Sequence, residues 1–203
     1  MKRVRELISM VQEQYPADRF FVNFEQTRRL SWAMRAQYEA YERAFICLDE
    51  QSWVDLRTKA LRHFNDHRVG QRKQGFFNQL NDAFAYQYLL SRGFDDLRVL
   101  AEDGKKRPDL SYSHNEELCF CEVKTISVSD DEIARRSSGK SFSSANYCEL
   151  TSEFFSKLSS TLDMAFDQIN SQGGGGLIYL ILNFDDLALD HYDTYRRQIM
   201  ECL

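Results

Sequence analysis

The sequence predicts an α/β protein in which a mixed sheet flanked by helices follows an N-terminal helical extension. Three observations carry this prediction. Apolar residues recur at helical spacing over residues 1–64, the pattern changes to strand-like runs after Gly93, and helices and strands then alternate to the end. We place the boundary between an N-terminal helical region, residues 1–72, and an α/β core, residues 73–203, in a polar segment that holds two glycines.

The N-terminal region is predicted to be helical because large apolar side chains recur every three or four positions, with few strand formers between them. The residues that set this spacing are Leu30, Met34, Tyr41, Phe45, Leu48, Trp53, Leu56, Ala60 and Phe64. We interpret Trp32, Trp53 and the other aromatic residues of these helices as core rather than as a platform for stacking bases. A further helix is expected from about 76 to 92, since Gly93 is a good C-terminal stop.

Three strand-like runs come next, at residues 97–101, 109–113 and 118–126. The four residues from His114 to Glu117 separate the second run from the third, a length that suits a hairpin. The first three strands of the sheet are therefore expected from consecutive segments of the chain.

The rest of the chain continues with a loop, a helix, a strand and a helix. Seven serines among mixed charges in residues 127–146 indicate a long mobile loop. Apolar spacing between residues 155 and 169 marks an amphipathic helix, which the glycines at 173–176 end. The continuous apolar run 177–184 suits a strand covered on both faces, and a last helix is expected over 190–203.

Composition limits the classes of protein to which the chain can belong. It is 43% hydrophobic and 28% charged, as is ordinary for a globular domain, and no run approaches the roughly 20 apolar residues of a membrane span. The formal net charge of −5 argues against a protein that coats nucleic acid by charge alone. The five cysteines lack zinc-ligand spacing and no signal-peptide core follows the start, so we expect a cytoplasmic protein without a membrane partner.

The run 118–126 contains two charged residues within an otherwise apolar strand. Because side chains alternate along a strand, Glu122 and Lys124 project to one face. Cys119 and Cys121 project to the other face and are interpreted as small core residues. Burying a carboxylate is costly unless a cation or a set of hydrogen bonds compensates for it, and a divalent metal ion on Glu122 would provide this compensation.

Two more acids are predicted to lie near Glu122. Asp109 follows Pro108 at the start of the preceding strand, and the hairpin brings the ends of the two strands together. Asp82 lies three residues before Ala85 on the expected helix, so it points inward with the face that packs on the sheet. Hard cations such as Mg²⁺ prefer carboxylate oxygens, and one or two protein carboxylates suffice when waters and a phosphate fill the other positions.

This arrangement resembles the catalytic motif of the PD-(D/E)xK nuclease superfamily, the restriction-endonuclease-like fold. The matching pieces are Pro108-Asp109 and Glu122-Val123-Lys124, behind a helix that carries Asp82. The resemblance covers about residues 74–185, and it implies a core with the order helix, three strands, helix, strand.

The resemblance also implies a role for each residue of the motif. Asp109 and Glu122 would be the metal ligands, joined by the backbone carbonyl of Val123. Lys124 would orient the attacking water or stabilise developing negative charge. The family usually has Glu where this chain has Asp82. Because Asp is shorter by one methylene, we expect Asp82 to contact the metal through a water rather than directly. The implied cofactor is Mg²⁺, with Mn²⁺ as a substitute.

The function that the resemblance implies is that of a Mg²⁺-dependent nuclease, with an endonuclease on DNA favoured over one on RNA. Contacts to the substrate's phosphates are expected from Arg135, Arg136 and Lys140 in the serine-rich loop, and from the basic cluster within residues 57–73. Gln168 matches a polar position of some family members. Many double-strand cutters need two sites, so a homodimer is a further expectation.

Two alternatives stay open at the level of sequence. The first is a catalytically inactive module on the same fold that binds nucleic acid or a protein partner. The Asp82 substitution favours this alternative, whereas the retained Asp109, Glu122 and Lys124 oppose it. In the second, the N-terminal helices are the functional part, as an interaction or oligomerisation element.

Two other patterns are not interpreted as sites. His63 and His67 have the spacing of paired zinc ligands, but Asn65-Asp66 between them indicates a helix end and no Glu follows His63. The glycine run at 173–176 lacks the Lys-Ser/Thr pair of a phosphate-binding loop, so we interpret it as a helix-to-strand connection.

Overall fold

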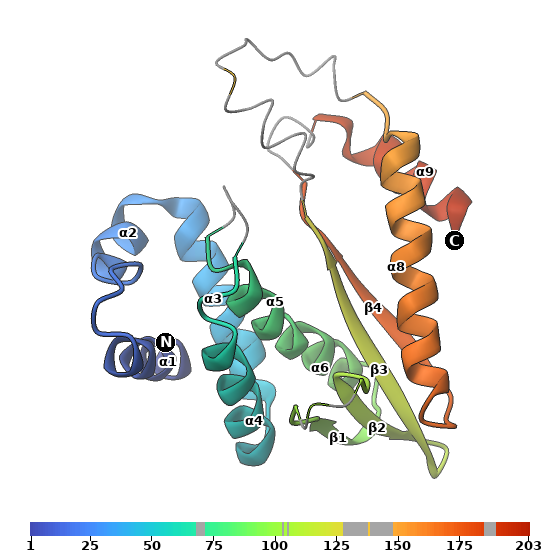
Figure 1. Cartoon of the computed structure of the whole chain (residues 1–203), viewed down its shortest axis with the longest axis horizontal. Helices are drawn as coiled ribbons and strands as arrows, with labels where there is room; N and C mark the ends of the chain where they lie inside the picture. The colour runs from blue at the N-terminus through green and yellow to red at the C-terminus, as the bar shows by residue number, and fades with distance from the viewer. Residues whose placement is uncertain (68–71, 103, 105, 128–137, 139–147, 185–189) are drawn as a thin grey trace.

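Figure 1 shows the fold as a computed structural model, which describes residues 1–67, 72–102, 104, 106–127, 138, 148–184 and 190–203. The helices of the first part are α1 (Lys2–Gln14), α2 (Phe24–Leu30), α3 (Trp32–Cys47), α4 (Glu50–Arg62), α5 (Gln74–Leu80) and α6 (Asp82–Ser91). The second part comprises β1 (Asp95–Val99), β2 (Leu110–His114), β3 (Glu117–Ile126), α8 (Ser152–Asn170), β4 (Gly176–Leu182) and α9 (Tyr192–Cys202). This architecture confirms the predicted α/β class, with a sheet flanked by helices after an N-terminal helical part.

The four described strands form one mixed sheet in the order β1-β2-β3-β4. β2 pairs antiparallel with both β1 and β3, whereas β4 lies parallel beside β3. A two-residue turn joins β2 to β3, in which Asn115 and Glu116 have φ angles of 52° and 66°, as short hairpin turns require. His114 and Glu117, which were expected in the loop, are instead paired as the last residues of the two strands, because a positive φ at both turn residues closes the hairpin more tightly.

The N-terminal helices and the sheet share one hydrophobic core. Its largest cluster of buried side chains includes Trp53 of α4, Leu110 of β2 and Cys121 of β3. Tyr88 of α6 reaches Tyr179 of β4, with ring centroids 5.5 Å apart. Core contacts therefore cross the expected boundary near residue 72, and residues of the helical part can reach the sheet.

The opposite face of β3 and β4 is covered by α8, which runs along both strands on the side away from the N-terminal helices (Figure 1). A smaller cluster there contains Ile126, Leu158 and Ile199, with Leu180 packed against it. Because side chains alternate along β4, Leu180 lies on the α8 side whereas Tyr179 lies on the α6 side. Both faces of this apolar strand are thus covered, as predicted, although its side chains are only half-buried because β4 is at the edge of the sheet.

The helix expected over residues 76–92 is two helices, α5 and α6, which meet at Asn81. The buried Asn81 amide accepts a hydrogen bond from the Tyr41 hydroxyl at 3.0 Å and donates one to the Thr125 hydroxyl of β3 at 2.9 Å. These two bonds satisfy a polar side chain inside the core and tie the start of α6 to the sheet. These long-range partners of Asn81 account for the break between α5 and α6. The apolar spacing continues across the break, so the sequence pattern did not predict it.

Leu30 and Trp32 are exposed, contrary to prediction, with 78% and 79% of their surface accessible. Ser31 lies between them and caps α3, since its hydroxyl accepts a hydrogen bond from the Met34 amide at 3.2 Å. Leu30 is thus the last residue of α2 and Trp32 the first residue of α3. Neither residue reaches the core, into which the middle of α3 packs. Trp53 is 1% exposed, as predicted.

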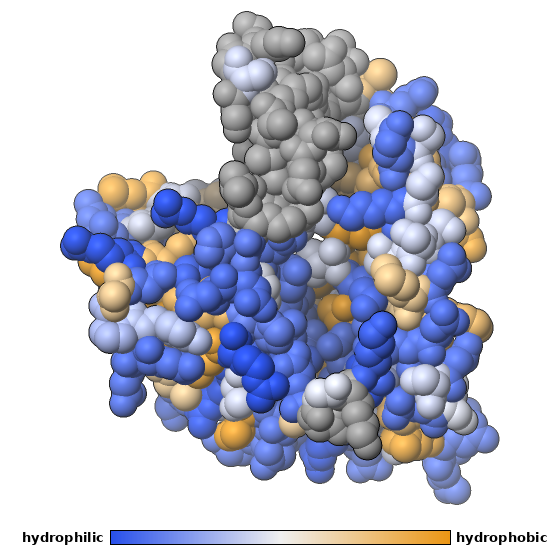
Figure 2. All heavy atoms as spheres, in the orientation of Figure 1, coloured by the Kyte–Doolittle hydropathy of each residue, from blue (hydrophilic) through white to orange (hydrophobic). Residues whose placement is uncertain are grey.

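Hydrophilic side chains cover most of the face of the molecule that Figure 2 shows, and hydrophobic ones are scattered among them. Exposed large apolar residues include Met164 and Phe166 on α8, each 60% exposed. None of the described helices combines the length and the apolar character that crossing a membrane requires.

Gly176 permits the close approach of β4 to β3. A Cβ atom at this position would lie 2.1 Å from the Phe120 carbonyl oxygen, so the strands would have to separate. We predict that Gly176→Ala lowers the free energy of unfolding by about 2 kcal/mol, as measured by urea denaturation. Gly175→Ala is the matched control because a Cβ atom there meets nothing within 4 Å. Equal losses in the two variants would contradict this explanation.

Candidate active site

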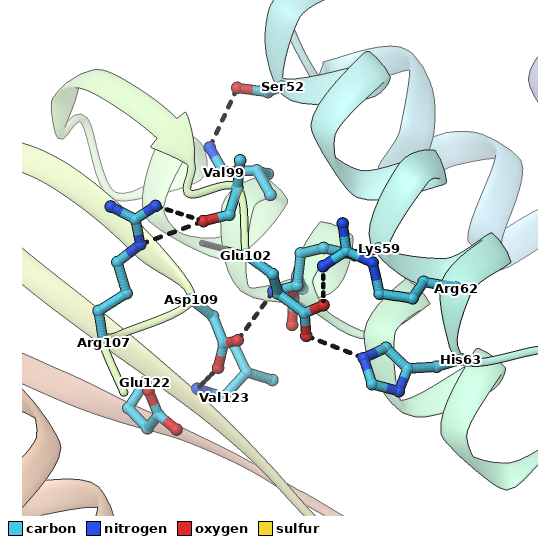
Figure 3. Close-up of polar contacts among 12 residues, drawn as sticks. Ser52, Lys59, Arg62, His63, Val99, Glu102, Arg107, Asp109, Glu122 and Val123 are labelled. Atoms are coloured by element: carbon cyan, nitrogen blue, oxygen red, sulfur yellow. Dashed lines mark hydrogen bonds and ion pairs between the residues drawn. The ribbon is translucent and has the colours of Figure 1, made fainter. Parts of the chain in front are cut away.

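Asp109 lies directly before β2 and is held on both sides by backbone hydrogen bonds. Its amide donates to the Cys121 carbonyl of β3 at 3.1 Å, and its carbonyl accepts from the Leu100 amide at 2.8 Å. The carboxylate Oδ2 accepts a hydrogen bond from the Val123 amide at 2.9 Å (Figure 3). Asp109 is therefore fixed against the segment of β3 in which Val123 stands between Glu122 and Lys124.

Glu122 and Lys124 lie on one face of β3, as the strand period predicted. Lys124 Nζ donates to Glu122 Oε1 at 2.5 Å. Glu122 is only 2% exposed, and its other oxygen, Oε2, is buried without a hydrogen-bond partner among the described residues. Burial and, next, the negative charge of Asp109 raise the pKa of Glu122 to about 7, although Lys124 opposes this shift.

Lys59 of α4 is a member of the site that the sequence did not reveal as one. Its ammonium donates to Asp82 Oδ2 at 2.8 Å and to Asp109 Oδ1 at 3.0 Å, and the residue is 3% exposed. Burial by itself would lower the pKa of Lys59, but the charges of Asp82 and Asp109 outweigh burial and raise the pKa overall. One signal could have pointed to Lys59: it lies three residues after Leu56, on the apolar face of its helix.

Asp82 is the first residue of α6 and points inward, as predicted, with 2% of its surface exposed. Burial and the neighbouring charge of Asp109 raise its pKa, and Lys59 counteracts them only in part. Two carboxylates share one ammonium, so this buried cluster carries a net negative charge when both carboxylates are ionised. The negative charge favours protonation of Asp82 and of Lys59, and the pKa of each group is raised. Asp82 is thus connected to Asp109 through Lys59, whereas the Glu122 side chain is bonded to Lys124.

Most of the basic cluster expected to contact phosphates is occupied by internal ion pairs. In residues 57–73, Arg57 pairs with Glu6, Arg62 with Glu102, and Lys73 with Asp18. These side chains hold helices and loops of the chain to one another, and Lys59 enters the site. The other predicted phosphate contacts, Arg135, Arg136 and Lys140, lie outside the described residues.

A pocket of about 170 Å³ opens beside the site. Lys59 and Asp109 line it from one side, together with Lys106, Arg107 and Gln168 from the segment before β2 and from α8. The Gln168 amide donates to the Arg107 carbonyl at 2.6 Å, which ties α8 to this segment. The sequence-based match of Gln168 to a polar position therefore falls on a residue that does border the site.

The residues present fit a hard cation held by two carboxylates rather than by three. Among the residues that the structure describes, no group of three His, Cys, Asp or Glu side chains gathers in a way that could hold a metal ion. Among the described residues, Oε2 of Glu122 has no hydrogen-bond partner, and Asp109 keeps unused lone pairs on oxygens that each accept one hydrogen bond. A Mg²⁺ ion with two such ligands would complete its coordination with waters and substrate oxygens.

Comparisons of the chain with protein-family models, with curated proteins and with solved structures found no match. The likeness to the PD-(D/E)xK motif therefore depends on Asp109, Glu122, Lys124 and the elements that carry them. Function is inferred below from the chemistry of these residues.

The buried charge of Glu122 predicts a pH dependence of stability in metal-free protein. Its folded-state pKa of about 7 exceeds the ordinary value, so the folded state binds the proton more tightly and stability falls as pH rises from about 4.5 to 7. We predict that Glu122→Gln raises the free energy of unfolding at pH 8 by up to about 3 kcal/mol. The gain should vanish near pH 4, where the parent carboxyl is protonated in both states.

Chemical denaturation with EDTA at pH 4, 6 and 8 measures this difference. Glu117→Gln is the matched control, since Glu117 is exposed on the same strand. A gain in the free energy of unfolding for Glu122→Gln that does not change with pH would contradict the assignment of Glu122 as a buried carboxylate with a raised pKa.

Proposed function

We propose that the chain is a Mg²⁺-dependent nuclease of the PD-(D/E)xK type that hydrolyses phosphodiester bonds. One observation carries the proposal: Asp109 is hydrogen-bonded to the Val123 amide, between the paired residues Glu122 and Lys124, and a buried carboxylate oxygen of Glu122 has no hydrogen-bond partner among the described residues. A buried carboxylate oxygen that has no hydrogen bond is costly for a protein to retain, and a bound cation would remove this cost. Perturbed carboxyl groups of this kind gather at functional sites.

The order of elements supports the same proposal. The helix α6, the strands β1 to β3, the helix α8 and the strand β4 follow one another along the chain, in the order that the motif's family implies. A restriction-endonuclease-like core is part of the proposal on this basis.

The proposed roles follow from the positions of the side chains. Asp109 and Glu122 would hold the ion, and the Val123 carbonyl is the third ligand that the family resemblance implies. When bound, the ion would polarise a phosphate oxygen and lower the pKa of a bound water. Lys124 would add positive charge where the phosphate gains negative charge, and its bond to Glu122 holds the ammonium at the site.

The substrate that we propose is DNA, cut internally, with Mn²⁺ able to replace Mg²⁺. Lys106 is exposed and lines the pocket beside Asp109, so it is placed to contact a phosphate. The Arg107 guanidinium lines the same pocket but donates two hydrogen bonds to the Ala101 carbonyl. A homodimer would supply the two sites that cutting both strands requires.

The acids of the site are tested by isosteric neutralisation. We predict that Asp109→Asn and Glu122→Gln each lower Mg²⁺-dependent cleavage by on the order of a hundredfold or more, because each removes a ligand charge without removing volume. Cleavage is measured on labelled single- and double-stranded DNA and RNA with Mg²⁺ or Mn²⁺. Glu117→Gln should cleave like the parent, and parental rates in either site variant would rule out the proposal.

Lys124 is expected to act on turnover. We predict that Lys124→Met lowers the cleavage rate by about a hundredfold and changes Mn²⁺ affinity, measured by calorimetry, much less. The reason is that the ammonium is proposed to stabilise the transition state and not to bind the ion. A loss of metal binding as large as the loss of rate would contradict this role.

A catalytically inactive module on the same fold is the second candidate. One observation favours it: within the described part of the chain, the third acid, Asp82, is paired with Lys59 and no three-acid group gathers. Such a module would bind nucleic acid or a protein without a metal. Titration with Mg²⁺ and Mn²⁺ separates the candidates, because the module should bind neither ion.

A further inference from the structure

Lys59 places a positive charge between two carboxylates. Its Nζ is 2.8 Å from Asp82 Oδ2 and 3.0 Å from Asp109 Oδ1. Distances between Mg²⁺ and oxygen are about 2.1 Å, so closing each carboxylate by roughly 1 Å would give a bridging ion the same two partners. The ammonium and a divalent ion are therefore alternative occupants of this position.

The position is largely buried, and three separate segments of the chain supply its residues. The side chains of Lys59 and Asp82 are 4% and 3% exposed, and that of Asp109 is 20% exposed. Lys59 belongs to α4, Asp82 begins α6, and Asp109 precedes β2. A charge at such depth needs a fixed partner, which means that the ammonium is part of the packing and not a mobile surface group.

We propose that the Lys59 ammonium is a built-in second cation, which holds Asp82 and Asp109 in place and limits the site to one divalent ion. The inference rests on the proposed function, since it assigns the ion to Asp109 and Glu122 and removes Asp82 from the ligand set. Lys59 is a positioning residue in this scheme. It acts through Asp109 and needs no contact with substrate.

The first test counts metal ions in the full chain with Mn²⁺, by calorimetry and by electron paramagnetic resonance of the unbound ion. The parent should bind one Mn²⁺. Lys59→Met should bind two, because Asp82 and Asp109 lose their counter-ion, and the first ion should bind about tenfold more tightly without the repelling ammonium. The double variant Lys59→Met/Asp82→Asn should return to one ion.

The second test needs neither metal nor activity. In EDTA, Lys59→Met should melt at a lower temperature than the parent, since it removes the counter-ion of the buried Asp82 carboxylate and of the partly buried Asp109 carboxylate. The double variant should recover most of the loss. If Lys59→Met does not fold in EDTA, Mn²⁺ should restore its melting transition, and a failure to restore it would overturn the inference. Lys106→Met, which removes an exposed lysine of the adjoining pocket, is the control and should change neither the melting temperature nor the ion count.

The outcomes separate this inference from the proposed function. Two ions in the parent, or one ion in both the parent and Lys59→Met, would overturn the role of Lys59 while leaving a metal-dependent site. No ion in the parent would reject the proposed function. In that case, an ion gained by Lys59→Met alone would still support the inference, and no gain would overturn it as well.

Discussion

One buried ammonium group, shared by a buried and a partly buried carboxylate, joins the helical part of the molecule to the sheet. Lys59 of α4 bonds to Asp82 at the start of α6 and to Asp109 before β2. Removing one partner from a buried ion pair leaves an uncompensated charge and is strongly destabilising. The three elements therefore have to pack so that these side chains stay within hydrogen-bond distance, and the hydrophobic core around Trp53 and Leu110 forms under that constraint.

The charges at this centre do not cancel. Lys59 donates hydrogen bonds to Asp82 and Asp109, and Lys124 donates one to a single oxygen of Glu122. The other oxygen of Glu122 has no hydrogen-bond partner among the described residues. Stability alone would favour an apolar or fully paired arrangement at these positions. Burial and the neighbouring charge of Asp109 raise the pKa of Glu122, and carboxyl groups with perturbed pKa values are found most often at functional sites.

Three basic residues of the cluster within residues 57–73 hold parts of the fold together. Arg57, Arg62 and Lys73 each pair with an acid on another helix or loop. Partly exposed pairs of this kind contribute little stability individually, but they engage side chains that the sequence suggested as phosphate contacts. Any electrostatic attraction of a polyanion must then come from other groups, among them the exposed Lys106 beside the pocket.

Local sequence was enough to predict the class of the fold, the hairpin of β2 and β3, and the shared face of Glu122 and Lys124. These features follow from side-chain periods and turn lengths, which depend on residues only a few positions apart. Only the packed chain revealed the break at Asn81 and the entry of Lys59 into the site. The partners of Lys59 are 23 and 50 residues away along the chain. A buried charge takes as its partners whichever acids the packing brings within reach, and no local pattern records that choice.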